Sequence, residues 1–310
     1  MSNNINFMTR HSMIPHNPIT FLKVIVAATL IMVIGSAAVS KTMACTTNLH
    51  VLAISADQNG TVHNDNLAPS SSPIIMDTSP DVEEALDQAF ALKDAFQDEE
   101  ALEAFTNIVE KESDHYEALW NIVMLHTAIG NRQSSSSAEE AHYEKAKEYA
   151  ERLLEAHPDS AGSHFAYSAA VGRMAQSAGA RERLRLSTEI REHAERAVEL
   201  DAEYSRAWNV LGNWHHRAAN LSRMERFAAN ALFGGAPEGA SNENAREAFK
   251  KAIEADPQYM LYYHDKAEFY ITIDEEENAR RVLLEGLEQD IITSDDERWR
   301  QNMQEMLNDL

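Results

Sequence analysis

Residues 208–257 read WNVLGNWHHRAANLSRMERFAANALFGGAPEGASNENAREAFKKAIEADP and decide the fold of this chain. The positions that matter are Trp208, Leu211, Gly212, His215, Ala245, Phe249, Ala252 and Pro257. Small residues at the two alanine places let two helices approach closely, and the aromatic ring between them fills the remaining space. The proline ends the second helix, because it lacks an N–H group and restricts the residue before it. The stretch therefore predicts a pair of packed helices.

The same pattern recurs along the chain. Trp120, His164 and Trp208 each open a copy, and they lie 44 residues apart. These residues resemble the tetratricopeptide repeat, W-x2-L-G-x2-Y followed by A-x3-F-x2-A and P. A repeat of this kind buries its apolar face only against its neighbours in a stack. The resemblance implies an extended surface that suits binding rather than catalysis.

Apolar residues recur with a helical period from Asp81 onward, which predicts an all-α, tetratricopeptide-like helix-turn-helix solenoid over residues 81–310. We expect five helix pairs. Their second helices carry Ala101-Phe105-Ile108, Ala146-Ala150-Leu153, Ile190-Ala194-Ala197, Ala245-Phe249-Ala252 and Ala279-Leu283-Gly286. A last helix begins at Ser294, where Glu297 three residues later predicts a capping box. Its apolar face predicts a C-terminal capping helix.

The repeats are longer than usual. Their opening residues lie 44, 44 and 55 residues apart from Trp120 to Tyr263, against about 34 in the common repeat. We expect long inserts between the two helices of a pair. The first insert contains Ser134 to Ser137 and predicts a loop, whereas the third, Leu221 to Ser241, is apolar and predicts a partly helical segment.

Residues 1–45 predict a targeting segment, either a signal peptide or a membrane anchor. A 16-residue apolar run, Val24 to Val39, follows two basic residues and precedes small ones. Cys45 is the only cysteine, and lipidation there, plain secretion and an uncleaved anchor remain as alternatives. Residues 46–80 hold serine, proline and Asn-Gly turn signals and predict a disordered linker. We therefore expect an exported protein, periplasmic or membrane-anchored.

The charge of the chain is strongly negative. Its formal net charge is −23, and only two of its 50 acidic residues, Asp57 and Asp65, precede Asp77. Such a surface repels nucleic acid phosphates and anionic lipid head groups, so we expect no nucleic acid partner. A solvated surface adapted to salt and a surface that recognises a basic partner both account for the acidity.

The third insert carries a second, more specific resemblance. The chain reads LGNW at 211–214, LS at 221–222, ER at 225–226 and ALFG at 231–234, and IREHAERA at 190–197. These motifs resemble those of the regulator of microtubule dynamics proteins. The resemblance implies a helical interaction domain, in a family linked to microtubules or to membrane contact and lipid handling.

The tetratricopeptide resemblance also implies a concave groove lined by the first helix of each pair. The residues that we expect to bind a peptide there are Asn121, Arg206, Asn209, Asn213, His216, His264 and Glu268. Asn side chains donate to and accept from a peptide backbone, and Arg pairs with carboxylates. A full carboxylate clamp would need more Lys and Arg than these positions supply. The sequence thus predicts a non-catalytic scaffold for a protein or peptide partner, and a solvated or inter-repeat polar face is the alternative.

A different hypothesis is that the array encloses a hydrophobic ligand such as a lipid, near a membrane. Its lining would be Leu221, Phe227, Leu232 and Phe233, unless these residues only plug the solenoid. No phosphate-loop, dinucleotide, nucleophile-elbow or zinc-protease motif occurs, so we expect no enzyme, no catalytic residue and no cofactor. Two adjacent pairs, His215–His216 and His264–Asp265, could suggest a metal ion. Adjacent histidines point about 100° apart on a helix, and no His-x3-His occurs, so we expect no metal site.

Overall fold

The computed structural model of this protein describes residues 80–233, 235 and 237–310. The predicted targeting segment 1–45 with Cys45, and the predicted linker 46–80 up to its last residue, lie outside the described residues. The described part of the chain consists of α-helices and their connections and contains no strand. None of its helices combines the length and the apolar composition that a membrane crossing requires.

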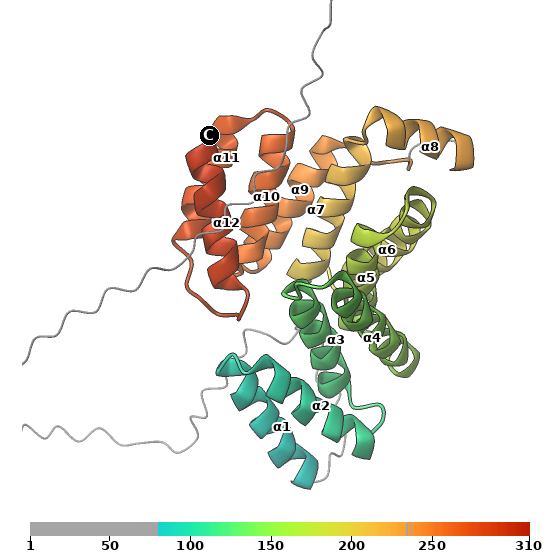
Figure 1. Ribbon diagram of the computed structural model, residues 1–310, viewed down its shortest axis with the longest axis vertical. Helices are drawn as coiled ribbons and strands as arrows, with labels where there is room; N and C mark the ends of the chain where they lie inside the picture. The colour runs from blue at the N-terminus through green and yellow to red at the C-terminus, as the bar shows by residue number, and fades with distance from the viewer. Residues whose placement is uncertain (1–79, 234, 236) are drawn as a thin grey trace, which may run out of the picture. The chain divides into compact units, whose positions relative to one another are not determined.

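The helices form hairpins that stack side by side in chain order (Figure 1). They are α1 (Pro80–Asp94), α2 (Asp98–Lys111), α3 (Tyr116–Asn131), α4 (Ser136–Ala156), α5 (Ala161–Ser177), α6 (Ala180–Leu200), α7 (Ser205–Ala219), α8 (Arg223–Phe233), α9 (Asn242–Ala255), α10 (Met260–Thr272), α11 (Glu276–Leu287) and α12 (Asp296–Asp309). The pairs are α1–α2, α3–α4, α5–α6, α7–α9 and α10–α11, and α12 packs on α10 and α11. This arrangement confirms the predicted all-α solenoid with its C-terminal cap.

In three of the copies the opening residue also secures the turn before it. Side chains of three types donate a hydrogen bond to the carbonyl six residues upstream. These bonds run from His164 Nε2 to Pro158 at 2.9 Å, from Trp208 Nε1 to Ala202 at 2.7 Å and from the Tyr263 hydroxyl to Pro257 at 2.8 Å. Because unlike groups make the same bond, histidine and tyrosine occupy the tryptophan place of the repeat in structure as well as in spacing.

The fourth pair shows why the pattern needs small residues. A Cβ atom added at Gly212 would lie 2.7 Å from the ring of Phe249, which is fully buried between α7 and α9. Ser241 starts α9 as its N-cap, and its hydroxyl accepts the N–H of Asn244 at 3.0 Å. The close contact that the sequence pattern predicts is therefore present, and it fixes the position of α7.

The prediction that Ser134 to Ser137 form a loop is wrong for its second half. Ser135 is the N-cap of α4 and its hydroxyl accepts the N–H of Ala138, so Ser136 and Ser137 are helical. Serine favours an N-cap because its side chain satisfies a free N–H at the helix start. The extra length of the second and third copies lies mainly in α4 and α6, which have 21 residues each against 14 in α9. The third insert contains α8, which confirms its partly helical character.

The predicted capping box at Ser294 is absent, because Ser294 serves another purpose. Its hydroxyl donates to Asp98 Oδ2 at 2.5 Å, while Arg132 binds the same oxygen at 2.6 Å. Arg132 also binds Asp295 Oδ1 at 3.1 Å, and Asp98 is only 3% exposed. This cluster joins the start of α2, the α3–α4 turn and the start of α12. The first repeat and the C-terminal cap are therefore linked directly.

Candidate ligand-binding cavity

A cavity of about 840 Å³ lies between the first helices of the second to fifth pairs. Its lining comes from α3, α5, α7 and α10, with further residues from α6, the α8 segment and Trp299 of α12. Helices that start each pair therefore face a common space. This is the side of the array where the sequence predicts a binding groove.

The structure brings six of the seven predicted groove residues to this cavity. The six that line it are Arg206, Asn209, Asn213, His216, His264 and Glu268. Asn121 does not line it: its Oδ1 accepts from Lys93 Nζ at 2.7 Å and its Nδ2 donates to the carbonyl of Glu117 at 2.8 Å. The role of all seven in binding stays a prediction.

Asp265 organises the α7–α10 side of the cavity, and the sequence analysis did not assign it to the groove. Its Oδ2 accepts from Asn209 Nδ2 at 2.8 Å and from Asn213 Nδ2 at 2.7 Å, and its Oδ1 lies 3.1 Å from His264 Nδ1. Burial raises the pKa of Asp265, but the His264 ring and the two amides outweigh burial and hold the pKa below its usual value. Asn209 and Asn213 therefore each use the Nδ2 group to donate to Asp265, so their amides are only partly available to a peptide backbone.

The cavity also carries more cations than the sequence analysis expected. Arg173 on α5 and Arg217 on α7 line it together with Arg206, and we call these three residues the cationic lining. No carboxylate lies within 4.0 Å of any of their guanidinium groups in the described part of the chain. Arg183, a fourth lining arginine, pairs with Glu225 at 3.4 Å. The predicted groove positions themselves hold no further Lys or Arg, and Arg173 and Arg217 reach the cavity from other positions of α5 and α7.

Aromatic rings hold the half-buried Arg206 in place. Its guanidinium carbon lies 4.3 Å from the centre of the Tyr259 ring and 5.5 Å from the centre of a Trp120 ring. Lys93 Nζ approaches the same Trp120 side chain to 5.8 Å. Burial, and to a smaller extent the charge of Arg206, lower the pKa of Lys93 to about 8. Lys93 and Arg206 thus both lie near the Trp120 indole, and neither forms an ion pair with a carboxylate in the described part of the chain.

The residues predicted to bind an apolar ligand do not all lie at the cavity. Leu221 lines the cavity. Phe227 is 76% exposed and does not line it. The side chains of Leu232 and Phe233 lie outside the described residues. Other apolar groups take their place in the lining, among them Phe165, Leu184, Ile190 and Leu261.

The fold and the shared cavity define a helical-repeat protein of the tetratricopeptide type. A solved structure of a thermophilic tetratricopeptide-repeat protein from Thermus thermophilus superposes with a TM-score of 0.54 at 17% identity, covering 73% of this chain and 99% of that one. Residues 84–310 match the family described as Regulator of microtubule dynamics protein 1-3, and the chain belongs to this family.

Individual relatives match over part of their length. Regulator of microtubule dynamics protein 3 from Rattus norvegicus is 28% identical over 191 residues, which is 61% of this chain and 40% of the rat protein. Regulator of microtubule dynamics protein 1 from Bos taurus is 29% identical over 181 residues, which is 58% of this chain and 56% of the bovine protein. The chain therefore spans about half the length of the curated relatives it matches.

Proposed function

We propose that the cavity binds an extended segment of a partner protein, and that the cationic lining binds acidic groups of that segment. The observation that carries this proposal is the placement of Arg173, Arg206 and Arg217 around one cavity without ion-pair partners. The lining holds four arginines, with Arg183, against the three carboxylates of Glu225, Asp265 and Glu268, a formal excess of one positive charge in a chain whose net charge is −23. A local excess of positive charge, in arginines without ion-pair partners, attracts acidic groups of a ligand.

The geometry suits recognition as well as attraction. A guanidinium binds a carboxylate through two parallel N–H donors, which adds direction to charge. Arg206 is already held against Tyr259, so binding would immobilise little additional side-chain freedom. Glu268 is exposed on the cavity lining and offers an acceptor for peptide N–H groups. The tetratricopeptide-type fold, which is a binding scaffold in other proteins, supports the same assignment.

The location of this activity is also a proposal. The apolar run Val24 to Val39 supports export, with Cys45 or the uncleaved segment tethering the domain to a membrane and residues 46–80 spacing it from the tether. The family name points to microtubule dynamics, and that role comes to this chain only as an alternative setting for the same cavity. The mass of the protein from membrane and soluble fractions distinguishes a lipidated Cys45, a soluble cleaved form and an uncleaved anchor.

The test is a selection of peptides on the immobilised full chain from a random display library. We expect enriched peptides to contain more Asp and Glu than the library, and the enrichment to disappear with Arg206→Gln combined with Arg217→Gln. Arg281→Ala, on the exposed side of α11, is the matched control and should leave the selection unchanged. Enrichment of neutral or basic peptides, or no dependence on the two arginines, would overturn the proposal.

A hydrophobic ligand is the second candidate, and the apolar part of the lining favours it. Phe165, Leu184, Ile190, Leu221 and Leu261 face the same space as the arginines, so a lipid with an anionic head group would find both of its chemistries there. Organic extraction of the purified chain followed by mass spectrometry tests this candidate. A stoichiometric lipid that is lost with Leu261→Glu would support it, and an extract without lipid would count against it.

A further inference from the structure

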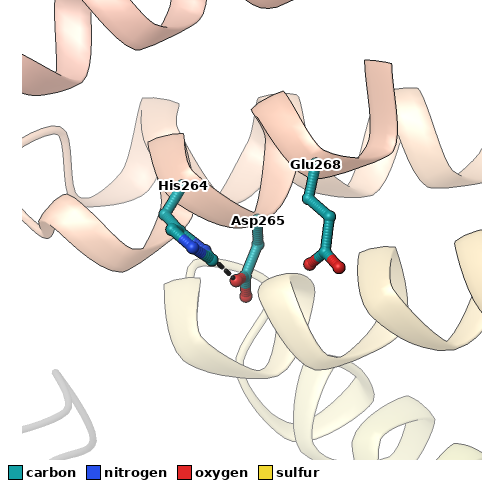
Figure 2. A group of neighbouring side chains, drawn as sticks. All are labelled: His264, Asp265 and Glu268. Atoms are coloured by element: carbon teal, nitrogen blue, oxygen red, sulfur yellow. Dashed lines mark hydrogen bonds and ion pairs between the residues drawn. The ribbon is translucent and has the colours of Figure 1, made fainter. Parts of the chain in front are cut away.

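Three side chains of one helical turn gather on α10 and face one side of it: His264, Asp265 and Glu268, which we call the α10 cluster (Figure 2). One nitrogen or oxygen atom from each lies within 4.8 Å of the others. His264 and Glu268 are four residues apart, the spacing that places two side chains on the same helix face. One imidazole and two carboxylates form a donor set that suits divalent first-row metal ions.

We propose that the α10 cluster binds one divalent transition metal ion, with His264, Asp265 and Glu268 as its protein ligands. The separation of 3.1 Å between His264 Nδ1 and Asp265 Oδ1 fits this assignment. Two ligands that each lie about 2.1 Å from one metal ion are about 3.0 to 3.4 Å apart in octahedral or tetrahedral geometry. When the ion binds, it replaces the proton that these two atoms share.

The surroundings of Asp265 are those of a supported metal ligand. Asn209 and Asn213 both donate to Oδ2, which fixes the carboxylate and leaves Oδ1 directed at His264. Hydrogen bonds from neighbouring side chains orient carboxylate ligands in this way in many metal sites. No Lys or Arg lies within 4.0 Å of Asp265 in the described part of the chain. Its negative charge, with a side chain only 13% exposed, is therefore balanced by no Lys or Arg there, and Oδ1 contacts only His264 Nδ1.

A second, independent observation points to a missing partner at this place. Asn209 and His216 are each 6% exposed, and both line the cavity beside the α10 cluster. Asn209 Oδ1 and His216 Nδ1 have no hydrogen-bond partner among the described residues. A buried acceptor that is left unpaired costs free energy, about 1–3 kcal/mol for each group. Asn209 Oδ1 belongs to the amide whose Nδ2 donates to Asp265, so an unpaired buried acceptor stands next to a proposed ligand.

The assignment does not depend on a peptide ligand, since its test needs only the metal-stripped full chain. We would measure binding of ZnCl₂ and MnCl₂ by calorimetry, with the bound metal counted after equilibrium dialysis. We expect one strong equivalent, and at least a tenfold loss of affinity for that equivalent with Glu268→Gln. Asp265→Asn should remove it, and Asn209→Ala should weaken it about tenfold or more.

The controls separate this site from the other histidines and acids of the chain. Glu268 is exposed and its side chain makes no described contact, so Glu268→Gln should keep the helical circular dichroism signal and isolates the metal effect. Glu285→Gln on α11 and His142→Gln on α4 should leave the strong equivalent unchanged. If all these variants bind alike, if the strong equivalent survives Asp265→Asn, or if the wild-type chain shows only weak multiple binding, the proposal is overturned.

Discussion

The cationic lining and the α10 cluster share one cavity but hold their charges in opposite ways. Asp265 is surrounded by neutral donors and one histidine, so its charge is stabilised within the fold. Arg206 has no carboxylate and rests on aromatic rings, so its charge remains available to a ligand. The comparison shows that Arg206 and Asp265 line one cavity of this acidic chain, and that neither forms an ion pair with a Lys, Arg, Asp or Glu side chain in the described residues. We infer that the α10 cluster contributes more to stability and the cationic lining more to binding.

We expect the largest effect on stability from a substitution that loosens α7, the helix on which both regions depend. Phe249→Ala empties the space between α7 and α9, and α7 carries Asn209 and Asn213 as well as Arg206 and Arg217. We expect the free energy of unfolding to fall by about 3–5 kcal/mol, as for other buried aromatic residues. Urea unfolding followed by circular dichroism measures this loss. A loss below about 1 kcal/mol would show that α7 is not held by this contact.

The next effect separates the two regions by stability. Asp265→Ala leaves the Nδ2 groups of Asn209 and Asn213 without their acceptor, so we expect the free energy of unfolding to fall by about 1–3 kcal/mol. Arg206→Gln should change it by less than about 1 kcal/mol, because no buried partner is left unpaired. Glu285→Ala is the exposed control for Asp265. Equal losses for Asp265→Ala and Arg206→Gln would contradict the comparison.

Lowering the pH should reduce the contribution of Asp265 to stability and leave the charges of the cationic lining unchanged. The pKa of Asp265 is lower in the folded chain than the usual value of about 3.9 that we take for the unfolded chain. Its contribution to stability is therefore complete above the unfolded pKa and is lost as the pH falls through the folded pKa. The difference in unfolding free energy between wild type and Asp265→Asn should shrink below about pH 4. A difference that stays constant down to pH 2 would refute this.

A further pH effect concerns Lys93, which lies next to Arg206 at Trp120. Its pKa is about 8 in the folded chain and about 10.4 in model peptides, so between these values the unfolded chain binds more protons. The stability of wild type should therefore rise from pH 8 to pH 10 relative to Lys93→Met. If the unfolding free energies of the two proteins change with pH in the same way, burial and Arg206 do not disfavour the charged form of Lys93.

Much of the fold could be predicted from the sequence, because the repeat is defined by the spacing of residues that lie close together in the chain. The alanine, aromatic and proline places determine how α7 packs on α9, and they predict the pairs without any long-range information. The fate of the extra residues could not be predicted in the same way. A serine run fits a loop and an N-cap equally well, and the length of α4 is decided by its packing.

The site was predictable only in part, for a similar reason. Counting helix positions finds Arg206, Asn209 and Asn213, since those side chains share a face of α7. It misses Asp265, whose two asparagine partners lie more than 50 residues away, and Arg173, which reaches the cavity from a neighbouring repeat. His264 and Asp265 were a candidate metal pair in the sequence and were set aside with the adjacent histidines; Glu268, four residues after His264, is the member of the cluster that was missed.

The central claim is that Arg206 in the cavity binds a carboxylate of the partner segment. The most direct test is a double-mutant cycle between Arg206→Gln and a Glu→Gln change in the tightest selected acidic peptide, measured by fluorescence anisotropy on the full chain. We predict that each single change weakens binding about tenfold, which is about 1.4 kcal/mol, and that the two changes together cost little more than one alone. Fully additive losses for every acidic position of the peptide would contradict the claim.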